Sequence, residues 1–118
     1  MILSDRELVE MLREPRTRRE GFAVLVKQYS EKLYWKVRRI VLSHEDANDV
    51  LQNVFIKVWS NLQNFQGKSS LSTWLYRIAI NESLDFLRKQ KLSDRVSADE
   101  DVSVASRLMS DEYFDGDE

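Results

Sequence analysis

The polar residues that could do chemistry fall into two groups, one within 46–62 and one within 65–91. In the first group, Asp49, Gln52, Asn53 and Ile56 are separated by three, one and three positions. On a helix this spacing puts them on one face, because residues three or four apart are neighbours. Three polar groups beside an aliphatic one are typical of a protein-binding face. The alternative is a solvated helix face with one stray Ile, and spacing alone favours that alternative.

The second group follows one line along a predicted helix over 70–91. Its members are Ser70, Thr73, Arg77, Asn81, Leu84 and Arg88. At 100° per residue they fall within ~60° of that line. Arg, Asn, Ser and Thr are the residue types that contact phosphates and base edges. The stripe is equally well explained as the solvent face of the helix, and spacing leaves both interpretations open.

The segment before this helix, 65–70, joins an aromatic side chain to a cation. It reads Phe65-Gln66-Gly67-Lys68-Ser69-Ser70. An exposed aromatic ring beside cationic groups can stack on an unpaired base. The alternative is that the Phe65 ring folds back into the core. A P-loop is excluded, since the segment lacks the earlier Gly and the preceding strand that a P-loop requires.

The composition argues against catalysis. The chain has no Cys and one His, which excludes a disulfide framework and thiol catalysis and disfavours a His-based metal site. His44, at a predicted helix start, is expected to be a surface or capping residue. Glu82 and Asp85 lie on one helix without a nucleophile or metal ligand beside them. We therefore predict a protein that is not an enzyme and needs no cofactor.

Capping signals mark where the predicted helices begin. Ser4 and Glu7 form an S-x-x-E capping box before a short helix. Thr17 and Glu20 repeat the pattern before a long helix that runs to about Leu42. Such a box satisfies two free backbone N–H groups at once, so the sequence predicts two helix starts here.

Two further helices complete the predicted fold. Ser43 caps the third, which is followed by the loop before 70–91. Apolar residues recur three and four apart, and the expected core positions are Phe22, Leu25, Val26, Tyr29, Leu33, Val37, Ile40, Ala47, Val50, Leu51, Val54, Phe55, Val58, Leu62, Leu71, Trp74, Leu75, Ile78, Ala79 and Phe86. Trp35 and Trp59 are also expected in the core. The predicted fold class is all-α, a compact four-helix bundle.

Charge divides the chain at about residue 92. Residues 1–92 have 16 Lys and Arg against 11 Asp and Glu, whereas residues 93–118 have 2 against 9. We expect a folded domain over 1–92, followed by an acidic, mostly disordered tail or linker over 93–118. A tail that only maintains solubility is the alternative. A run of ~18 apolar residues and a signal peptide are both lacking, so we expect a cytoplasmic protein without a membrane span.

Two motifs resemble a known family. One is D-x-x-Q-x-x-F from Asp49 to Phe55, and the other is F-x-G-x-S-S-L-x-T-W-L-Y-R-I-A-x-N from Phe65 to Asn81. Together they resemble the second conserved domain of bacterial sigma-70-type factors of the extracytoplasmic-function group. The resemblance extends over about 4–91. It favours binding faces over solvent-exposed faces as the interpretation of both residue groups.

The resemblance implies partners for both groups. Asp49, Gln52, Asn53 and Ile56 would face the clamp coiled coil of the RNA polymerase β′ subunit. The family commonly has Glu where this chain has Asn53, so one ion pair with a basic β′ residue is expected to be weakened. An anti-sigma factor is a further expected partner by family habit.

The resemblance also implies a role in opening promoter DNA. Phe65 and the loop through Ser70, including Lys68 and Ser69, would line the pocket for a flipped base of the nontarget strand. Asn81 and its neighbours Thr73, Arg77 and Arg88 would recognise the −10 element. Many relatives have a basic residue at the position of Gln66, so phosphate attraction is expected from Lys68. Catalysis would belong to the polymerase.

The chain departs from the two-domain plan of this group. A second, helix-turn-helix domain that recognises the −35 element is expected in such factors, but only the acidic stretch follows Lys91. That stretch is similar to the start of an interdomain linker, so we expect the chain to be a fragment. The competing hypothesis is a helical interaction module that sequesters a protein partner and never touches DNA.

Overall fold

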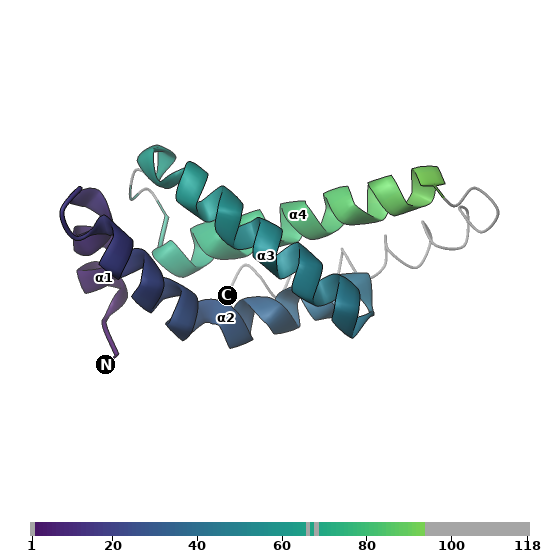
Figure 1. The fold of residues 1–118 in the computed structure, drawn as a ribbon, viewed down its shortest axis with the longest axis horizontal. Helices are drawn as coiled ribbons and strands as arrows, with labels where there is room; N and C mark the ends of the chain where they lie inside the picture. The colour runs from purple at the N-terminus through teal and green to yellow at the C-terminus, as the bar shows by residue number, and fades with distance from the viewer. Residues whose placement is uncertain (1, 66, 68, 94–118) are drawn as a thin grey trace.

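The computed structural model describes residues 2–65, 67 and 69–93. Their elements are α1 (Asp5–Arg13), α2 (Arg18–Val41), α3 (His44–Ser60), the 3-10 turn η1 (Leu62–Asn64) and α4 (Leu71–Ser93). The described part of the chain contains four α-helices and no strand, which confirms the predicted all-α bundle (Figure 1). The acidic stretch predicted to be a tail lies outside the described residues, apart from Ser93 at the end of α4.

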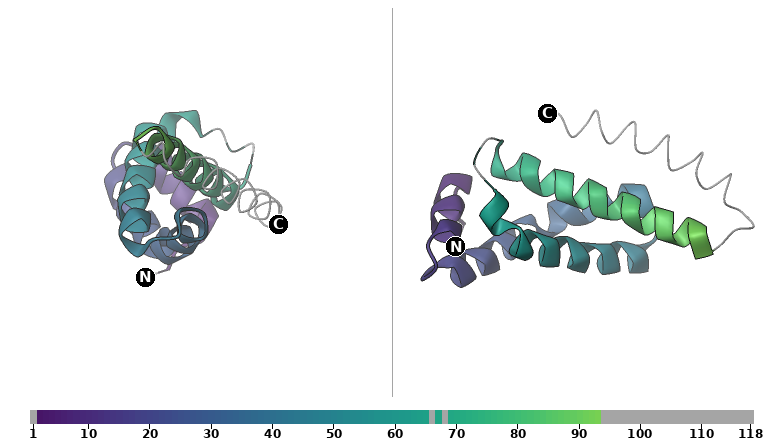
Figure 2. Two further views of the ribbon diagram at one scale, coloured as in Figure 1. Left: turned by 90° about the vertical axis from the view of Figure 1, so that its right-hand side faces the viewer. Right: turned by 90° about the horizontal axis from the view of Figure 1, so that it is seen from above.

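The long helix α2 is the centre of the bundle. It packs against α1, α3 and α4, and α3 also packs against α4. The chain reverses between α2 and α3, so these helices run in opposite directions, whereas α4 runs in the same direction as α2 (Figure 1). The last turns of α4 project past the other helices (Figure 2). α3 and α4 therefore each turn one face to the core and one to solvent.

All three of these predicted helix starts are confirmed, but the capping box expected at the second, at Thr17, is not formed. Ser4 and Glu7 form the capping box, and the hydrogen bonds from Ser4 lower the pKa of the exposed Glu7 carboxyl. The hydroxyl of Ser43 accepts from the backbone N–H of Asp46. Thr17 makes no capping bond; its hydroxyl donates instead to the carbonyl of Met11, at 2.8 Å. The Thr17 hydroxyl thus links α2 to the last turns of α1 instead of capping α2.

Close packing fixes α1 against α2. The hydroxyl of Tyr29 donates to the carboxylate of Asp5 at 2.8 Å, and burial together with this bond raises the Tyr29 pKa. Gly21 is buried where the two helices meet, and a Cβ added there would lie 2.8 Å from the Cβ of Met11. A larger residue at this position would therefore push the helices apart.

The core is formed mostly by the predicted apolar positions. The buried apolar residues are Leu8, Leu12, Leu25, Tyr29, Leu33, Val37, Ile40, Val41, Ala47, Val50, Val54, Val58, Leu71, Leu75 and Ala79. Trp74 is half-buried against them. The expectation for the other two tryptophans is wrong: Trp35 is 54% exposed and Trp59 is 42% exposed. Trp35 lies two positions from Leu33, a rotation of about 200° on a helix, so it faces away from the core.

The corner between α2 and α3 sets the direction of α3. Leu42 has a positive φ of 66°, and its N–H donates to the carbonyl of Arg38 at 3.0 Å. His44, the next helix start, is exposed, and its ring nitrogens contact the hydroxyl of Tyr34 and the amide of Asn48. His44 is thus a surface residue, as expected from the sequence.

Candidate functional site

The residues predicted to bind a protein lie together on α3. Asp49, Gln52, Asn53 and Ile56 are all exposed, opposite the buried residues of the same helix. Ile56 is 62% exposed, a large fraction for an aliphatic side chain. These four residues are called the α3 face below. The structure therefore brings together all four residues that the spacing predicted.

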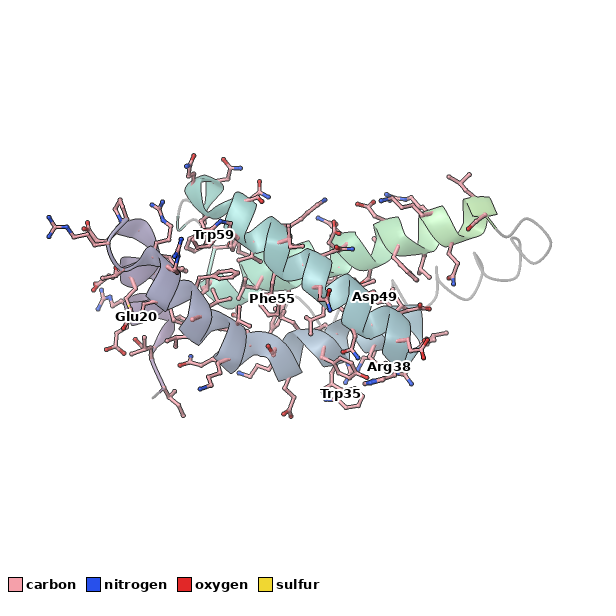
Figure 3. All side chains as sticks on the ribbon, viewed as in Figure 1. Glu20, Trp35, Arg38, Asp49, Phe55 and Trp59 are labelled. Atoms are coloured by element: carbon pink, nitrogen blue, oxygen red, sulfur yellow. The ribbon has the colours of Figure 1, made fainter. Side chains whose placement is uncertain are left out.

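Trp59 extends the α3 face and was missed by sequence reasoning. It follows Ile56 by three positions, and its ring packs edge-on against Phe22 of α2, with centroids 5.1 Å apart. The remaining exposure leaves part of the indole open to a partner, and Figure 3 shows it at the opposite end of α3 from Asp49. Counting seven positions from Gln52, about two helical turns, would have placed Trp59 on this side.

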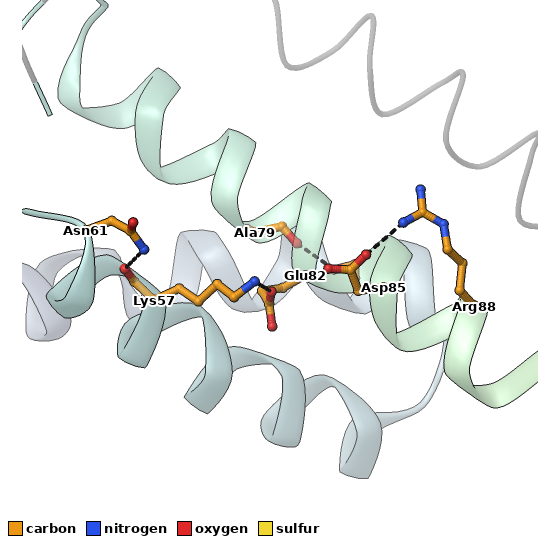
Figure 4. A network of polar contacts seen from close by, with 7 residues as sticks. Lys57, Asn61, Ala79, Glu82, Asp85 and Arg88 are labelled. Atoms are coloured by element: carbon orange, nitrogen blue, oxygen red, sulfur yellow. Dashed lines mark hydrogen bonds and ion pairs between the residues drawn. The ribbon is translucent and has the colours of Figure 1, made fainter. Parts of the chain in front are cut away.

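An ion pair joins α3 to α4. The ammonium of Lys57 lies 2.7 Å from a carboxylate oxygen of Glu82 (Figure 4). The hydrogen bond and the charge of Glu82 raise the pKa of Lys57. The Lys57 side chain is 53% exposed and that of Glu82 only 11% exposed. Solvent screening at the exposed partner limits the pair to ~0.2–1 kcal/mol, so it orients the helices more than it stabilises them.

The loop between α3 and α4 is held by short-range hydrogen bonds. The side-chain amide of Asn61 donates to the carbonyl of Lys57, and that of Asn64 donates to Asn61. Phe65 follows, half-buried, with its ring centroid 5.0 Å from that of Trp74. The aromatic residue that was predicted either to stack on a base or to join the core therefore lies at the edge between core and solvent.

The residues predicted to follow one line along α4 are called the α4 stripe below: Ser70, Thr73, Arg77, Asn81, Leu84 and Arg88. Hydrogen bonds at the start of α4 engage the first two of them. The hydroxyl of Ser70 accepts from the backbone N–H of Thr73 and donates to its hydroxyl at 2.8 Å. Ser69 and Thr73 are half-buried. Lys68 is outside the described residues. The Ser70 hydroxyl therefore caps the helix and bonds to Thr73, which leaves both hydroxyls only partly available to a ligand.

The rest of the α4 stripe is more open. Arg77, Asn81 and Arg88 are exposed, and Leu84 is half-buried. Arg88 pairs with Asp85 at 2.8 Å (Figure 4). Within the described part of the chain, the side chains of Arg77 and Asn81 make no hydrogen bond or ion pair. These two residues are the free polar groups of the stripe, and one is a cation and the other an amide.

Arg13 is a neighbour of the loop that sequence reasoning missed. Gly67 has a φ of 75°, and a Cβ added there would lie 3.4 Å from a guanidinium nitrogen of Arg13. The last turn of α1 thus places a cation beside the loop. The two residues are 54 positions apart in the chain, and no local pattern could have linked them.

The described residues contain neither a membrane-spanning helix nor a cluster of metal ligands. None of the described helices has an apolar stretch long enough to cross a bilayer. Among the same residues, no three His, Asp or Glu side chains gather as a set of metal ligands.

The fold defines a helical domain with two exposed polar faces on one shared core. Residues 25–93 match the model of the family described as sigma-70 region 2. The chain belongs to the sigma-70 region 2 family. This confirms the resemblance inferred from the two motifs.

Curated relatives agree with this assignment. The chain is 38% identical over 113 residues to the RNA polymerase sigma-H factor of Pseudomonas aeruginosa, covering 96% of this chain and 54% of that protein. It is 33% identical over 96 residues to the ECF RNA polymerase sigma factor SigW of Bacillus subtilis, covering 78% and 51%. It is 41% identical over 88 residues to the ECF RNA polymerase sigma-E factor of Escherichia coli K12, covering 75% and 44%. The chain spans about half the length of the curated relatives it matches.

Proposed function

We propose that this chain binds the RNA polymerase core through the α3 face and melted −10 promoter DNA through the α4 stripe and its loop. The observation that supports this proposal most directly is the separation of the two surfaces. The α3 face combines a carboxylate and amides with an exposed Ile, whereas the free groups of the α4 stripe are Arg77 and Asn81. One surface suits a basic protein partner and the other suits a nucleic acid.

At the α3 face, the proposed partner is the β′ clamp coiled coil. The carboxylate of Asp49 would pair with a basic side chain, the amide of Gln52 would fix the register, and Ile56 would be buried on binding. Full burial of such an aliphatic side chain contributes ~1.5–3 kcal/mol. Asn53 offers an amide in place of a second carboxylate, so we expect weaker ion pairing here than in relatives with Glu.

At the loop and α4, the proposed ligand is a nontarget-strand base held outside the stack. Unstacking a base costs a few kcal/mol. Stacking on an aromatic ring offsets ~1–3 kcal/mol per base, and Phe65, which packs against Trp74, would contribute it. Asn81 has an amide that can donate to and accept from one base edge. Arg13, Lys68 and Arg77 would attract the phosphates.

The proposed role implies further features of the protein. Initiation takes place with RNA polymerase, so the protein would act in the cytoplasm, and the polymerase would perform the catalysis. An anti-sigma factor is a proposed regulator. Residues 1–92 are the proposed binding domain, and the acidic residues after it are the proposed tail or linker.

A double dissociation tests the proposal. Asn81→Ala is expected to weaken binding of a −10 single-stranded DNA by ~1–3 kcal/mol and to leave the affinity for the isolated β′ clamp coiled coil unchanged. Asp49→Ala is expected to do the reverse. Fluorescence anisotropy with labelled DNA and calorimetry with the coiled coil provide the two affinities.

Two matched variants serve as controls in this experiment. Gln90→Ala, an exposed amide on α4 away from the stripe, and Glu31→Ala, an exposed carboxylate on α2, are expected to change neither affinity. If Asn81→Ala and Phe65→Ala both bind DNA like the wild type, the DNA part of the proposal is wrong. The hypothesis of a protein-interaction module without DNA binding would then be favoured.

A further inference from the structure

A row of cations on α2 belongs to neither proposed binding surface. Lys32, Lys36 and Arg39 are four and three positions apart, which places them on one side of the helix. Lys32 and Arg39 are exposed and Lys36 is half-buried. The ammonium of Lys36 lies 5.2 Å from the ring centroid of Tyr76 on α4. The row therefore meets α4 at Lys36, while the ammonium of Lys32 lies 5.6 Å from the ring centroid of Tyr29 on α2 itself.

The adjoining flank of α4 is apolar. Tyr76, Ile80 and Leu84 follow one another at intervals of four and are all half-buried. α2 and α4 run in the same general direction (Figure 1), and the two rows meet at the contact between Lys36 and Tyr76. Beyond this contact Arg39 follows on α2, and Ile80 and Leu84 follow on α4, whereas Lys32 lies one turn before it. The two rows together are called the α2–α4 strip. It combines partly exposed apolar side chains with a cationic edge.

The composition of residues 94–118 is complementary to the strip. This segment has nine Asp and Glu against two Arg, and apolar residues are interspersed among the acids. The apolar group is Val102, Val104, Leu108 and Met109. Carboxylates on either side of a short apolar group match an apolar row with a cationic edge in both charge and hydrophobicity.

The chain is long enough to reach the strip. From Ser93 back to Tyr76 is 17 residues of α4, or ~25 Å at 1.5 Å per residue. The 25 residues after Ser93 can extend over ~80 Å. A tethered ligand also has an effective concentration in the millimolar range, so weak complementarity is sufficient for binding within one chain.

We infer that the acidic segment 94–118 binds the α2–α4 strip of its own chain, with its carboxylates against Lys32, Lys36 and Arg39 and its apolar residues against Ile80 and Leu84. The inference goes beyond the proposed function and holds without DNA or polymerase. Leu84 also belongs to the α4 stripe, so the bound segment would place negative charge beside the proposed DNA surface and oppose its phosphates.

A spin label on the segment tests this inference in the full chain. Because the chain has no Cys, Ser106→Cys gives a single labelling site. A nitroxide there is expected to broaden the NMR signals of Arg39 and Ile80 and to leave those of Gln52 and Asn53 on the α3 face sharp. No broadening at the strip, or equal broadening on both sides of the molecule, would overturn the inference.

Charge reversal provides the matched control. Lys32→Glu with Arg39→Glu is expected to abolish the broadening, whereas Arg16→Glu with Arg19→Glu, an equal change at exposed positions, preserves it. Raising the ionic strength from ~0.1 M to ~1 M shortens the Debye length from about 10 Å to about 3 Å and is expected to reduce the effect. Identical behaviour of the two charge-reversal pairs would contradict the inference.

Two further samples make the result decisive. If the strip variant loses its helical circular dichroism, Asp99→Asn with Asp101→Asn weakens the same contact from the segment side, and unchanged broadening would then overturn the inference. Binding between copies is detected in a mixture of two kinds of chain. One is the spin-labelled Ser106→Cys chain without isotope label, and the other is the isotope-labelled wild-type chain, which has no Cys and therefore no spin label. Broadening in that mixture equal to that within one chain would replace the intramolecular contact by a dimer and contradict the inference.

Discussion

The α3 face and the α4 stripe differ in how far their side chains are already engaged. On the α3 face, Asp49, Gln52 and Ile56 project from one regular helix and are exposed together. In the loop and stripe, Ser70 bonds to Thr73, Arg88 pairs with Asp85, and Phe65 packs on Trp74. The α3 face would therefore bind its proposed partner without giving up internal contacts. The α4 stripe would have to exchange some internal contacts for contacts to a ligand, which reduces the net binding energy.

The largest expected effect comes from the core that both surfaces share. Leu75 of α4 is fully buried, and Leu75→Ala is expected to lower the free energy of unfolding by ~2–5 kcal/mol, because it leaves a cavity between the helices. Urea denaturation measures the loss. Leu92→Ala, on the exposed last turn of α4, serves as the control and is expected to leave the midpoint unchanged. A small loss of unfolding free energy in Leu75→Ala would mean that the α3 face and the α4 stripe are not supported by one shared core.

A smaller effect is expected at the α1–α2 contact. Gly21→Ala places a methyl group 2.8 Å from the Cβ of Met11. Overpacking of this kind costs ~1–3 kcal/mol and exceeds the ~0.5–1 kcal/mol that Ala gains over Gly in a helix. Amide hydrogen exchange is expected to speed up in α1 and to remain unchanged in α3. Equal acceleration in both helices would show that α1 does not move independently of the α3 face.

The salt dependence of DNA binding is expected to distinguish Arg13, which lies beside the loop, from Arg88, which is paired with Asp85. Arg13→Gln is expected to reduce the slope of DNA affinity against salt by about one phosphate contact. Arg88→Gln is expected to reduce it less, because Arg88 is already paired with Asp85. Titrations of single-stranded DNA at several salt concentrations measure both slopes. If the two variants have the same slope, the ion pair does not limit the availability of Arg88.

The smallest effect concerns the ion pair that joins the two surfaces. Lys57→Met is expected to cost ~0.2–1 kcal/mol at neutral pH. The pKa of Lys57 is raised in the folded protein above its ordinary value of 10.5. Its contribution is therefore complete below pH 10.5 and is lost as the pH rises through the higher folded-state value.

The difference in unfolding free energy between wild type and Lys57→Met, followed from neutral to alkaline pH, measures this loss. Lys27→Met, at an exposed position of α2, is the control and is expected to show no such dependence. A constant difference across the whole pH range would mean that the ammonium of Lys57 is not the group that stabilises the contact between α3 and α4.

Much of the fold could be predicted from local patterns. The capping box of Ser4 and Glu7, the cap at Ser43 and the shared face of Asp49 and Ile56 are all as the sequence indicates. These features depend on hydrogen bonds and neighbours within four residues, so the chain itself specifies them. Residue type alone misplaces Trp35 and Trp59 in the core, because their positions on the helices leave them exposed.

Contacts between distant segments required the tertiary structure. The sequence by itself determined four helices, their main caps and the polar composition of two faces, because these follow from short-range spacing. Only the packing of the helices decided that Arg13 lies beside Gly67, that Lys57 meets Glu82, and that Phe65 rests on Trp74. Such pairs depend on the angles at which whole helices cross, which are set by how the side chains of the entire core interlock.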